Sequence, residues 1–449
     1  MSAGVRVRRW LAALAEPIPA ERGRLNEARW ALLPERLRTS QQTMGRGHHS
    51  CGATYGVMER CDFACTSCYL SKTANATTPL EEAKVRAQLD ALRAYLGPQG
   101  KAQITSGEVT LLPVETLGTY VAYARKIGLD PMVMTHGQRL LEKPEYLRRL
   151  VADFGLKKLS IHVDSTQRGR RGWRRGIEEQ ELHPIRDAYA HLIRETRRAT
   201  GRTLHVATTV TVHLGNLEQI PQILDWILDN NDAFRMVSFQ PVAAVGRTQD
   251  SRIEGLTLDG VWEQICSGVR QELNRHAMYF GHPECHIVAP VVVVRCGEER
   301  FVLETARAGK RWDKAFLGRL MQAFGGFSTY DKPRWLNTAQ LLLLGARHPR
   351  LLLEAPFYGL YRLWGVRRRL ASVAGQLLRL RPLTARPLAL IVHKFMSPDE
   401  LDTPVGRERL AACVFQLPVE GHGMVPMCQM NATDLRSSLD QARREKSSP

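Results

Sequence analysis

The sequence predicts an α/β protein built on a partial (β/α)6 barrel, with a cysteine-bearing extension at its C-terminal end. Two observations predict the barrel. Six short apolar segments between residues 45 and 245 alternate with segments of helical periodicity, which is typical of a parallel sheet. Polar residues follow these apolar segments, and barrel enzymes place their sites at the carboxyl ends of the strands. The extension is indicated by cysteines that recur after the barrel, at Cys285, Cys296, Cys413 and Cys428.

The predicted strands follow one another along the first half of the chain. The first, residues 53–58, precedes a loop with three cysteines, and the second, residues 102–105, leads into Ser106-Gly107-Glu108. The other predicted strands, each followed by polar residues, are residues 131–134, 159–163, 204–212 and 236–239, which lead to His136, Asp164, His213 and Gln240. In a parallel barrel these polar residues gather at one rim.

The chain divides into segments of different composition. Residues 1–44 form a basic helical extension, residues 45–245 form the barrel, and residues 246–330 form a linker that carries Cys285. Residues 331–390 are basic and amphipathic, and prolines are expected to break them into short helices. Residues 391–449 form a small domain with Cys413 and Cys428, followed by a charged tail.

The composition is that of a globular protein, and its positive charge indicates an anionic binding partner. The net charge of +18 points to nucleic acid, a phospholipid surface or an acidic substrate. No leader peptide or long apolar run is recognised, so we expect a cytoplasmic protein that at most lies on the inner membrane face. Nine cysteines, an odd number, then favour metal ligands over disulfides.

The cysteine loop reads Cys61-Asp-Phe-Ala-Cys65-Thr-Ser-Cys68-Tyr69. Three thiolates on one tight loop can hold three irons of a cubane cluster and leave the fourth iron open to a small molecule. Zinc is the other interpretation of this loop. Structural zinc sites usually combine two Cys-x2-Cys pairs, or cysteine with histidine, and this chain has no second such pair. The spacing therefore favours an iron–sulfur cluster.

This Cys-x3-Cys-x2-Cys motif resembles that of the radical SAM superfamily. The resemblance implies a [4Fe–4S] cluster whose open iron binds S-adenosylmethionine (SAM). One electron from the cluster, supplied by a reductase such as flavodoxin or ferredoxin, then breaks the S–C5′ bond of SAM. The resulting 5′-deoxyadenosyl radical abstracts a hydrogen atom from the substrate. The cofactor carries this chemistry, and the protein positions and shields it.

The same resemblance suggests SAM-binding residues. Ser106-Gly107-Glu108 resembles the superfamily's Gly-Gly-Glu, with serine in place of the first glycine, so Glu108 is expected to meet the SAM ammonium. Asp164 either accepts hydrogen bonds from the ribose hydroxyls or starts a loop and caps a helix. Tyr69 either packs on the adenine or is a core aromatic, and Gln240 either lines the barrel interior or is a hydrogen-bonded core residue.

A closer resemblance, to the tetraether lipid synthases, covers most of residues 48–433. It rests on four stretches: His49-Ser50-Cys51, Ser238-Phe-Gln-Pro-Val242 with Gly246-Arg247, Pro283-Glu-Cys285-His286, and Val425-Pro-Met-Cys428-Gln-Met-Asn431. The resemblance implies an auxiliary iron–sulfur cluster held by Cys285, Cys413 and Cys428, with Cys51 or Cys296 as a fourth ligand. The family's upstream N-terminal cysteines and the second cysteine soon after Cys285 are absent here. Cys266 is assigned to the core of a helix.

Residues 331–390 hold eleven Lys and Arg against Asp331 and Glu354, interleaved with leucines and aromatics. This pattern favours interfacial helices on an anionic membrane. Packing against the barrel is a second interpretation, and the apolar density argues against nucleic acid.

The sequence therefore predicts a radical SAM enzyme that abstracts hydrogen from a lipid or other hydrophobic substrate, with C–C bond formation as one outcome. A radical SAM maturase acting on a peptide is the alternative, because such enzymes also carry auxiliary clusters after the barrel. A zinc-stabilised nucleic-acid-binding protein is the remote alternative, which leaves the polar strand ends unexplained.

Overall fold

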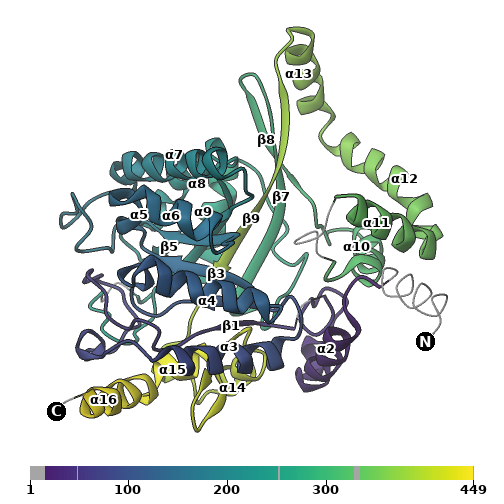
Figure 1. The fold of residues 1–449 in the computed structure, drawn as a ribbon. Helices are drawn as coiled ribbons and strands as arrows, with labels where there is room; N and C mark the ends of the chain where they lie inside the picture. Colours follow the sequence, from purple (N-terminus) through teal and green to yellow (C-terminus); the bar gives the residue numbers. More distant parts are fainter. Residues whose placement is uncertain (1–15, 48, 251–252, 328–333, 448–449) are drawn as a thin grey trace.

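The computed structural model describes residues 16–47, 49–250, 253–327 and 334–447. Its strands form one curled, eleven-stranded sheet with the order β11-β10-β1-β2-β3-β4-β5-β6-β9-β7-β8 (Figure 1). The fold is therefore mixed α/β, as the alternating pattern predicts.

The middle of the sheet is parallel and follows chain order. Its strands are β1 (Cys51–Ala53), β2 (Lys101–Ile104), β3 (Asp130–Thr135), β4 (Lys158–His162), β5 (His205–Val212) and β6 (Phe234–Pro241). Five of the six predicted strands overlap these positions. The first prediction is displaced, since β1 ends at Ala53 and most of residues 53–58 is irregular. Gly56 has a φ of +76° and donates its N–H to Ser106 Oγ, so the chain turns there instead of staying extended.

Helices between these strands and after β6 pack on the outer face of the sheet (Figure 1). They are α3 (Glu82–Leu96), α4 (Val114–Lys126), α5 (Gln138–Glu142), α6 (Pro144–Ala152), α7 (His183–Thr200), α8 (Ile220–Asp229) and α9 (Leu258–Val269). In α3, the residues at helical spacing, Val85, Leu89, Leu92 and Leu96, are fully buried. One continuous apolar core lies between these helices and the sheet.

The parallel sheet continues beyond the six predicted strands. β10 (Phe415–Val419) pairs parallel with β1, and β9 (Leu383–His393) pairs parallel with β6. The flanking strands β11 (Gly423–Pro426), β7 (His286–Cys296) and β8 (Glu299–Glu304) are antiparallel to their neighbours. The boundary expected at residue 390 thus falls inside β9, and the C-terminal segment builds part of the barrel wall rather than a separate domain. It continues through α14 (Pro404–Ala411), α15 (Met427–Ala432) and α16 (Leu435–Ser447).

The two ends of the parallel sheet meet through side chains. His393 at the end of β9 and Phe415 at the start of β10 stack with ring centroids 4.9 Å apart and planes inclined by 12°. Both rings line the interior of the barrel. The curled sheet therefore encloses a cavity, although no ladder of hydrogen bonds joins β9 to β10 in the strand order.

A helical arm projects from the barrel beside the β7–β9 ribbon (Figure 1). It comprises α11 (Arg334–Arg347), α12 (Pro349–Gly365) and α13 (Arg367–Leu378), and α12 packs on α10 (Arg311–Phe324). The expectation that Pro356 breaks a helix is wrong, because α12 continues through it. None of the helices described combines the length and apolar character needed to cross a membrane. At the other end of the chain, α2 (Ala20–Leu32) lies in the predicted N-terminal extension, whose residues 1–15 are outside the described residues.

Candidate functional site

The three clustered cysteines lie on the loop that follows β1 and line the barrel cavity. Cys61, Cys65 and Cys68 share its wall with residues at the carboxyl ends of the parallel strands. The loop is held to the segment after β4, because Ala64 N–H donates to Arg168 O at 2.7 Å and Thr66 N–H donates to Thr166 O at 2.9 Å. The backbone thus fixes three thiols at one mouth of the cavity.

The thiols lie close enough to influence one another. Burial, together with the neighbouring thiol of Cys68, raises the pKa of Cys61 to about 12 and that of Cys65 well above its usual range. Hydrogen bonds nevertheless reach two of the sulfurs. Phe63 N–H donates to Cys61 Sγ at 3.4 Å, and Arg247 Nε donates to Cys68 Sγ at 3.3 Å. Three half-buried thiols, two of them with donors aimed at their sulfurs, form a set suited to a metal cluster, which keeps thiolates ionised.

Two glycines allow backbone to approach this loop from both sides. A Cβ at Gly107 would lie 2.2 Å from Glu59 O, and a Cβ at Gly246 would lie 2.4 Å from Tyr69 O. Gly246 also has a φ of +59°, a region that favours glycine. The next residue, Arg247, donates its backbone N–H to Cys68 O at 2.9 Å. The Gly246-Arg247 pair therefore clamps the cysteine loop, a role that its position in the sequence does not reveal.

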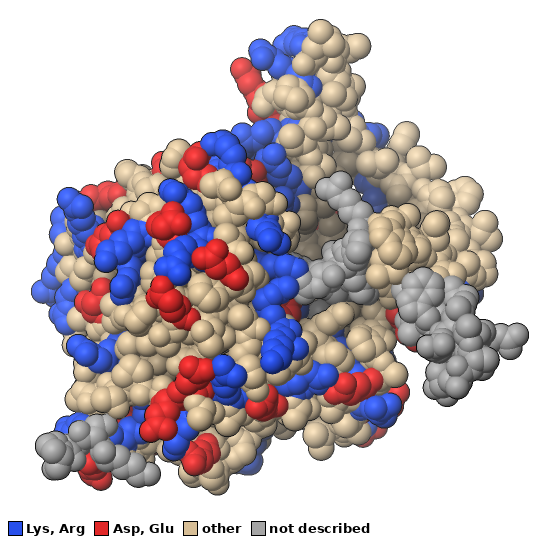
Figure 2. Space-filling model, viewed as in Figure 1, with Lys and Arg blue, Asp and Glu red and all other residues tan. Residues whose placement is uncertain are grey.

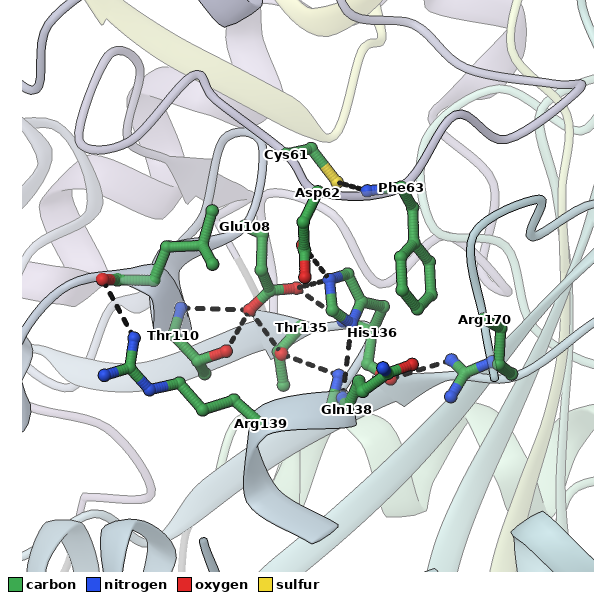
Figure 3. Close-up of polar contacts among 12 residues, drawn as sticks. Cys61, Asp62, Phe63, Glu108, Thr110, Thr135, His136, Gln138, Arg139 and Arg170 are labelled. Carbon is green, nitrogen blue, oxygen red and sulfur yellow. Dashed lines mark hydrogen bonds and ion pairs between the residues drawn. The ribbon is translucent and has the colours of Figure 1, made fainter. Parts of the chain in front are cut away.

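Glu108 is buried, with 1% of its surface exposed, and protein donors reach both of its carboxylate oxygens (Figure 3). Oε1 accepts hydrogen bonds from Thr110 N–H at 2.9 Å, Thr110 Oγ1 at 2.5 Å and Thr135 Oγ1 at 2.6 Å. Oε2 accepts one from His136 N–H at 2.8 Å, with His136 Nε2 3.2 Å away. Since a carboxylate offers about four acceptor positions, Glu108 is nearly saturated by the protein. Its predicted contact with the SAM ammonium stays a prediction, and it competes with these donors.

His136 links Glu108 to the cysteine loop (Figure 3). Its Nε2 lies 2.8 Å from Asp62 Oδ1, and its ring stacks on Phe63 at 3.7 Å with an angle of 9° between the planes. Asp62 and Phe63 directly follow Cys61 in the chain. Cys61, Asp62 and His136 also present ligand atoms within 4.8 Å of one another. Because the imidazole already bonds to a carboxylate and stacks on a ring, this group is better explained as a brace for the loop than as a separate ion site.

The other predicted SAM contacts also line the cavity, and most of them have protein partners. Asp164 Oδ1 accepts from Thr166 N–H at 3.0 Å and Oδ2 from Thr211 N–H at 2.9 Å, so both carboxylate oxygens are bonded to the protein backbone. Tyr69 Oη donates to Ser106 O at 2.8 Å, and burial raises the pKa of Tyr69 to about 12. Gln240 is the penultimate residue of β6 and is half-buried on the cavity wall.

His162 is a cavity residue whose importance the sequence does not reveal. It ends β4 and lines the cavity, and its Nε2 is buried without a hydrogen-bond partner among the described residues. Burial lowers the pKa of His162, so the ring is neutral at physiological pH. A buried polar atom without a protein partner is costly unless water or a ligand satisfies it. The described residues therefore leave this nitrogen of a cavity-lining side chain unsatisfied.

A second set of cysteines converges from distant parts of the chain. Cys285 precedes β7, Cys413 precedes β10 and Cys428 lies in α15. Burial raises the pKa of Cys285 to about 11, and nearby Cys413 adds to that rise. The pKa of Cys428 is also raised, by burial and by both other thiols. The fold therefore brings together the three cysteines that the sequence resemblance grouped.

Arg409 is a positively charged side chain that bonds to the second set of cysteines. Its Nε donates to Cys285 Sγ at 3.2 Å, while Nη1 donates to Glu400 Oε1 at 2.8 Å. Phe415 and Met427, the chain neighbours of this set, line the same cavity as Cys61, Cys65 and Cys68. The second set therefore lies beside the cavity that the first set lines, and its own thiols are not part of the cavity wall.

The remaining cysteines lie elsewhere. The thiol of Cys51 lies among Arg22, Lys101, Lys158 and Asp130, near the amino ends of the strands. Cys296 is the last residue of β7, ten residues beyond His286, which corresponds to about 33 Å of extended strand. The suggestion that Cys296 completes the second set is therefore wrong. Its thiol donates to Arg381 O in a separate apolar cluster. Cys266 is buried on α9 in the main core, as predicted.

Comparisons with known proteins add little. No family model and no curated protein matches this chain. The solved structures that resemble it include polyhistidine-tagged anSMEcpe with bound AdoMet at 11% identity and TM-score 0.31, and native anSMEcpe with bound AdoMet at 12% and 0.32. Another is native anSMEcpe with bound AdoMet and a peptide, at 10% and 0.34. The two structures with AdoMet alone each match over 43% of this chain and 51% of their own length. The structure with the peptide matches over 49% of this chain and 58% of its own length. The chain therefore spans about half the length of these structures. Likeness at these TM-scores supports no argument about function.

Proposed function

We propose that this protein is a radical SAM enzyme, in which Cys61, Cys65 and Cys68 hold a [4Fe–4S] cluster and the barrel cavity holds SAM. The observation that carries the proposal is the placement of three thiols of one loop at the mouth of a cavity inside a parallel sheet. When bound, the cluster supplies the electron that cleaves SAM and so starts hydrogen abstraction. A reductase such as flavodoxin or ferredoxin supplies that electron.

The residues of this chain have three tasks in that reaction. Gly107, Gly246 and the His136–Asp62 pair fix the cysteine loop. His162 and Gln240 present polar groups toward the molecule in the cavity. The sheet and the stacked His393–Phe415 pair surround the reaction space and limit the access of water.

The convergence of Cys285, Cys413 and Cys428 supports an auxiliary iron–sulfur cluster. These thiols come from three separate segments, and burying them near one another without a metal gives the protein no evident benefit. Three protein ligands leave one iron position for a substrate or another small ligand. Phe415 and Met427, which neighbour these cysteines in the chain, line the cavity, so such a ligand would reach the second set from that side.

The apolar part of the cavity wall favours a hydrophobic substrate. It comprises Val242, Ala243, Val245, Phe395, Phe415 and Met427. A saturated lipid chain fits such a wall without leaving a polar group unpaired, and C–C coupling of chain ends is then one outcome. A peptide that presents an apolar side chain is the second candidate, and it requires partners for its backbone amides in the same space.

Anaerobic reconstitution of the full chain tests the proposal. We expect at least four irons and four sulfides per chain, and SAM cleavage to 5′-deoxyadenosine when dithionite is added. A chain that binds one zinc and no sulfide would contradict the proposal. Lipid extracts from a deletion strain and its parent then separate the substrate classes, because only a lipid-modifying enzyme changes the chain composition directly.

A further inference from the structure

We propose that α11, α12, α13 and the turn into β9, residues 335–383, form a docking surface for an anionic phospholipid bilayer. This segment is called the arm below. The proposal goes beyond the proposed function and does not rest on the cysteine chemistry. It is carried by an exposed apolar surface and by the arginines that lie within it.

The arm holds most of the large apolar side chains that the protein leaves exposed. Of the 17 exposed large hydrophobic residues among the described residues, 13 lie on it. They are Trp335, Leu341, Leu342, Leu352, Leu353, Phe357, Leu360, Leu363, Trp364, Leu377, Leu378, Leu380 and Leu383. The visible side of α11 and α12 in Figure 2 is correspondingly mostly tan. Exposed apolar surface gathered on one part of a molecule marks an interaction site.

One side of α12 packs against α10, and the other side is exposed. Leu351 and Tyr358, seven residues apart, are buried, and Tyr358 stacks on Phe316 of α10 at 4.0 Å. Leu353 and Phe357, on the uncovered side, are 71% and 67% exposed. A surface helix normally turns polar residues outward, so a helix that is apolar on both sides requires a second apolar partner.

Charge identifies that partner. Residues 334–386 contain ten arginines and one acidic residue, Glu354. Arg319 and Arg350 both bond to that carboxylate, so it does not offset the others. The exposed arginines of the arm are Arg347, Arg350, Arg367, Arg368, Arg379 and Arg381. Leucine, tryptophan and arginine together match the acyl boundary and the anionic headgroups of a bilayer.

Other occupants fit this surface less well. A second copy of the arm would place like-charged arginines against one another at a shared interface. Nucleic acid would pair with the arginines but would leave Leu353, Phe357 and Trp364 in contact with phosphate or water. A bilayer satisfies both kinds of side chain at the same time.

The test uses the reconstituted full chain and vesicles of phosphatidylcholine, with or without phosphatidylglycerol, in a sedimentation assay. We expect binding only to the vesicles with phosphatidylglycerol, and weaker binding as salt is raised. Combining Leu353→Ser, Phe357→Ser and Trp364→Ser should reduce affinity at least tenfold, since it removes the groups that enter the acyl boundary. Combining Arg368→Gln, Arg379→Gln and Arg381→Gln should reduce it by about fivefold per arginine and weaken the salt dependence.

Matched controls change the same residue types away from the arm. Leu32→Ser with Val405→Ser removes exposed apolar residues, and Lys126→Gln with Lys143→Gln and Arg175→Gln removes exposed cations. Each control should change affinity less than twofold, and circular dichroism should show every variant folded. Equal vesicle binding by arm variants and controls would overturn the proposal. So would a dimer in size-exclusion chromatography that the Leu353, Phe357 and Trp364 changes convert to a monomer.

Discussion

The two cysteine sets of this protein are assembled in opposite ways. Cys61, Cys65 and Cys68 lie on one loop, whereas Cys285, Cys413 and Cys428 come from segments before β7, before β10 and within α15. The first set is local in the chain, and a short peptide loop could present it. The second set exists only after β9 and β10 have joined the sheet. The first set can therefore be recognised from the sequence as a motif, whereas the second set is a site only in the folded protein.

The two sets also share one feature. An arginine Nε donates to one sulfur of each set, Arg247 to Cys68 at 3.3 Å and Arg409 to Cys285 at 3.2 Å. A cation beside a cluster sulfur stabilises the reduced, more negative state of the cluster. The following predictions test whether the two sets are independent metal centres with one arginine each.

The largest effect is expected from the local set. Cys65→Ala should abolish SAM cleavage, because two remaining thiolates cannot hold a cubane with one open iron. The measurement is 5′-deoxyadenosine production with dithionite after anaerobic reconstitution. Cys266→Ala is the matched control, since this buried thiol lies on α9 outside both sets, and it should retain activity. Wild-type production by the Cys65 variant would remove the cluster assignment.

The second set should hold iron without the first. Replacing Cys61, Cys65 and Cys68 together by alanine should leave residual iron–sulfur absorbance, and adding Cys428→Ala should remove it. Adding Cys51→Ala instead should have no such effect, because the Cys51 thiol lies among Arg22, Lys101 and Asp130. A folded triple variant that is colourless and free of iron would show that these thiols are ordinary core residues.

The two arginines should act on separate centres. Arg409→Gln should lower the reduction potential of the second centre, and Arg247→Gln that of the first, because each loses a neighbouring cation. Redox titration followed by electron paramagnetic resonance measures both centres in one sample. The lysine variants keep the charge but lose the Nε–sulfur hydrogen bond, so their potentials should fall between those of wild type and the glutamine variants. Equal shifts of both centres in either variant would mean that the sets are not independent.

The smallest effect is expected at Glu108, whose carboxylate is linked through His136 to Asp62 of the cysteine loop. Glu108→Gln should weaken SAM binding about tenfold with the cluster spectrum intact, if its carboxylate reaches the ammonium as well as its protein donors. His136→Gln keeps the carboxylate and removes the contacts with Asp62 and Phe63, so it should change SAM affinity less. Titration of SAM against both reconstituted variants decides the point. Equal SAM affinities for the two variants would mean that Glu108 only stabilises the cysteine loop.

The sequence by itself determined the parts of this protein that local patterns encode. The spacing of Cys61, Cys65 and Cys68 singled out the loop, and alternation of apolar and helical segments located five of the six central strands. The dense leucines and arginines of residues 331–390 marked the arm. Each of these signals depends on residues within a few turns or one strand of one another.

Only the tertiary structure decided which distant residues meet. β9 pairs with β6 after an intervening stretch of about 140 residues, so no local sequence pattern predicts the position of β9 in the barrel wall. The same pairing places His393 against Phe415 and brings Cys285 near Cys413 and Cys428, while it carries Cys296 to the far end of β7. Thr110, Thr135 and His136 donate four hydrogen bonds to Glu108, whereas His162 Nε2 has no partner among the described residues. Such contacts are set by the packing of whole elements, and therefore by the three-dimensional fold rather than by sequence spacing.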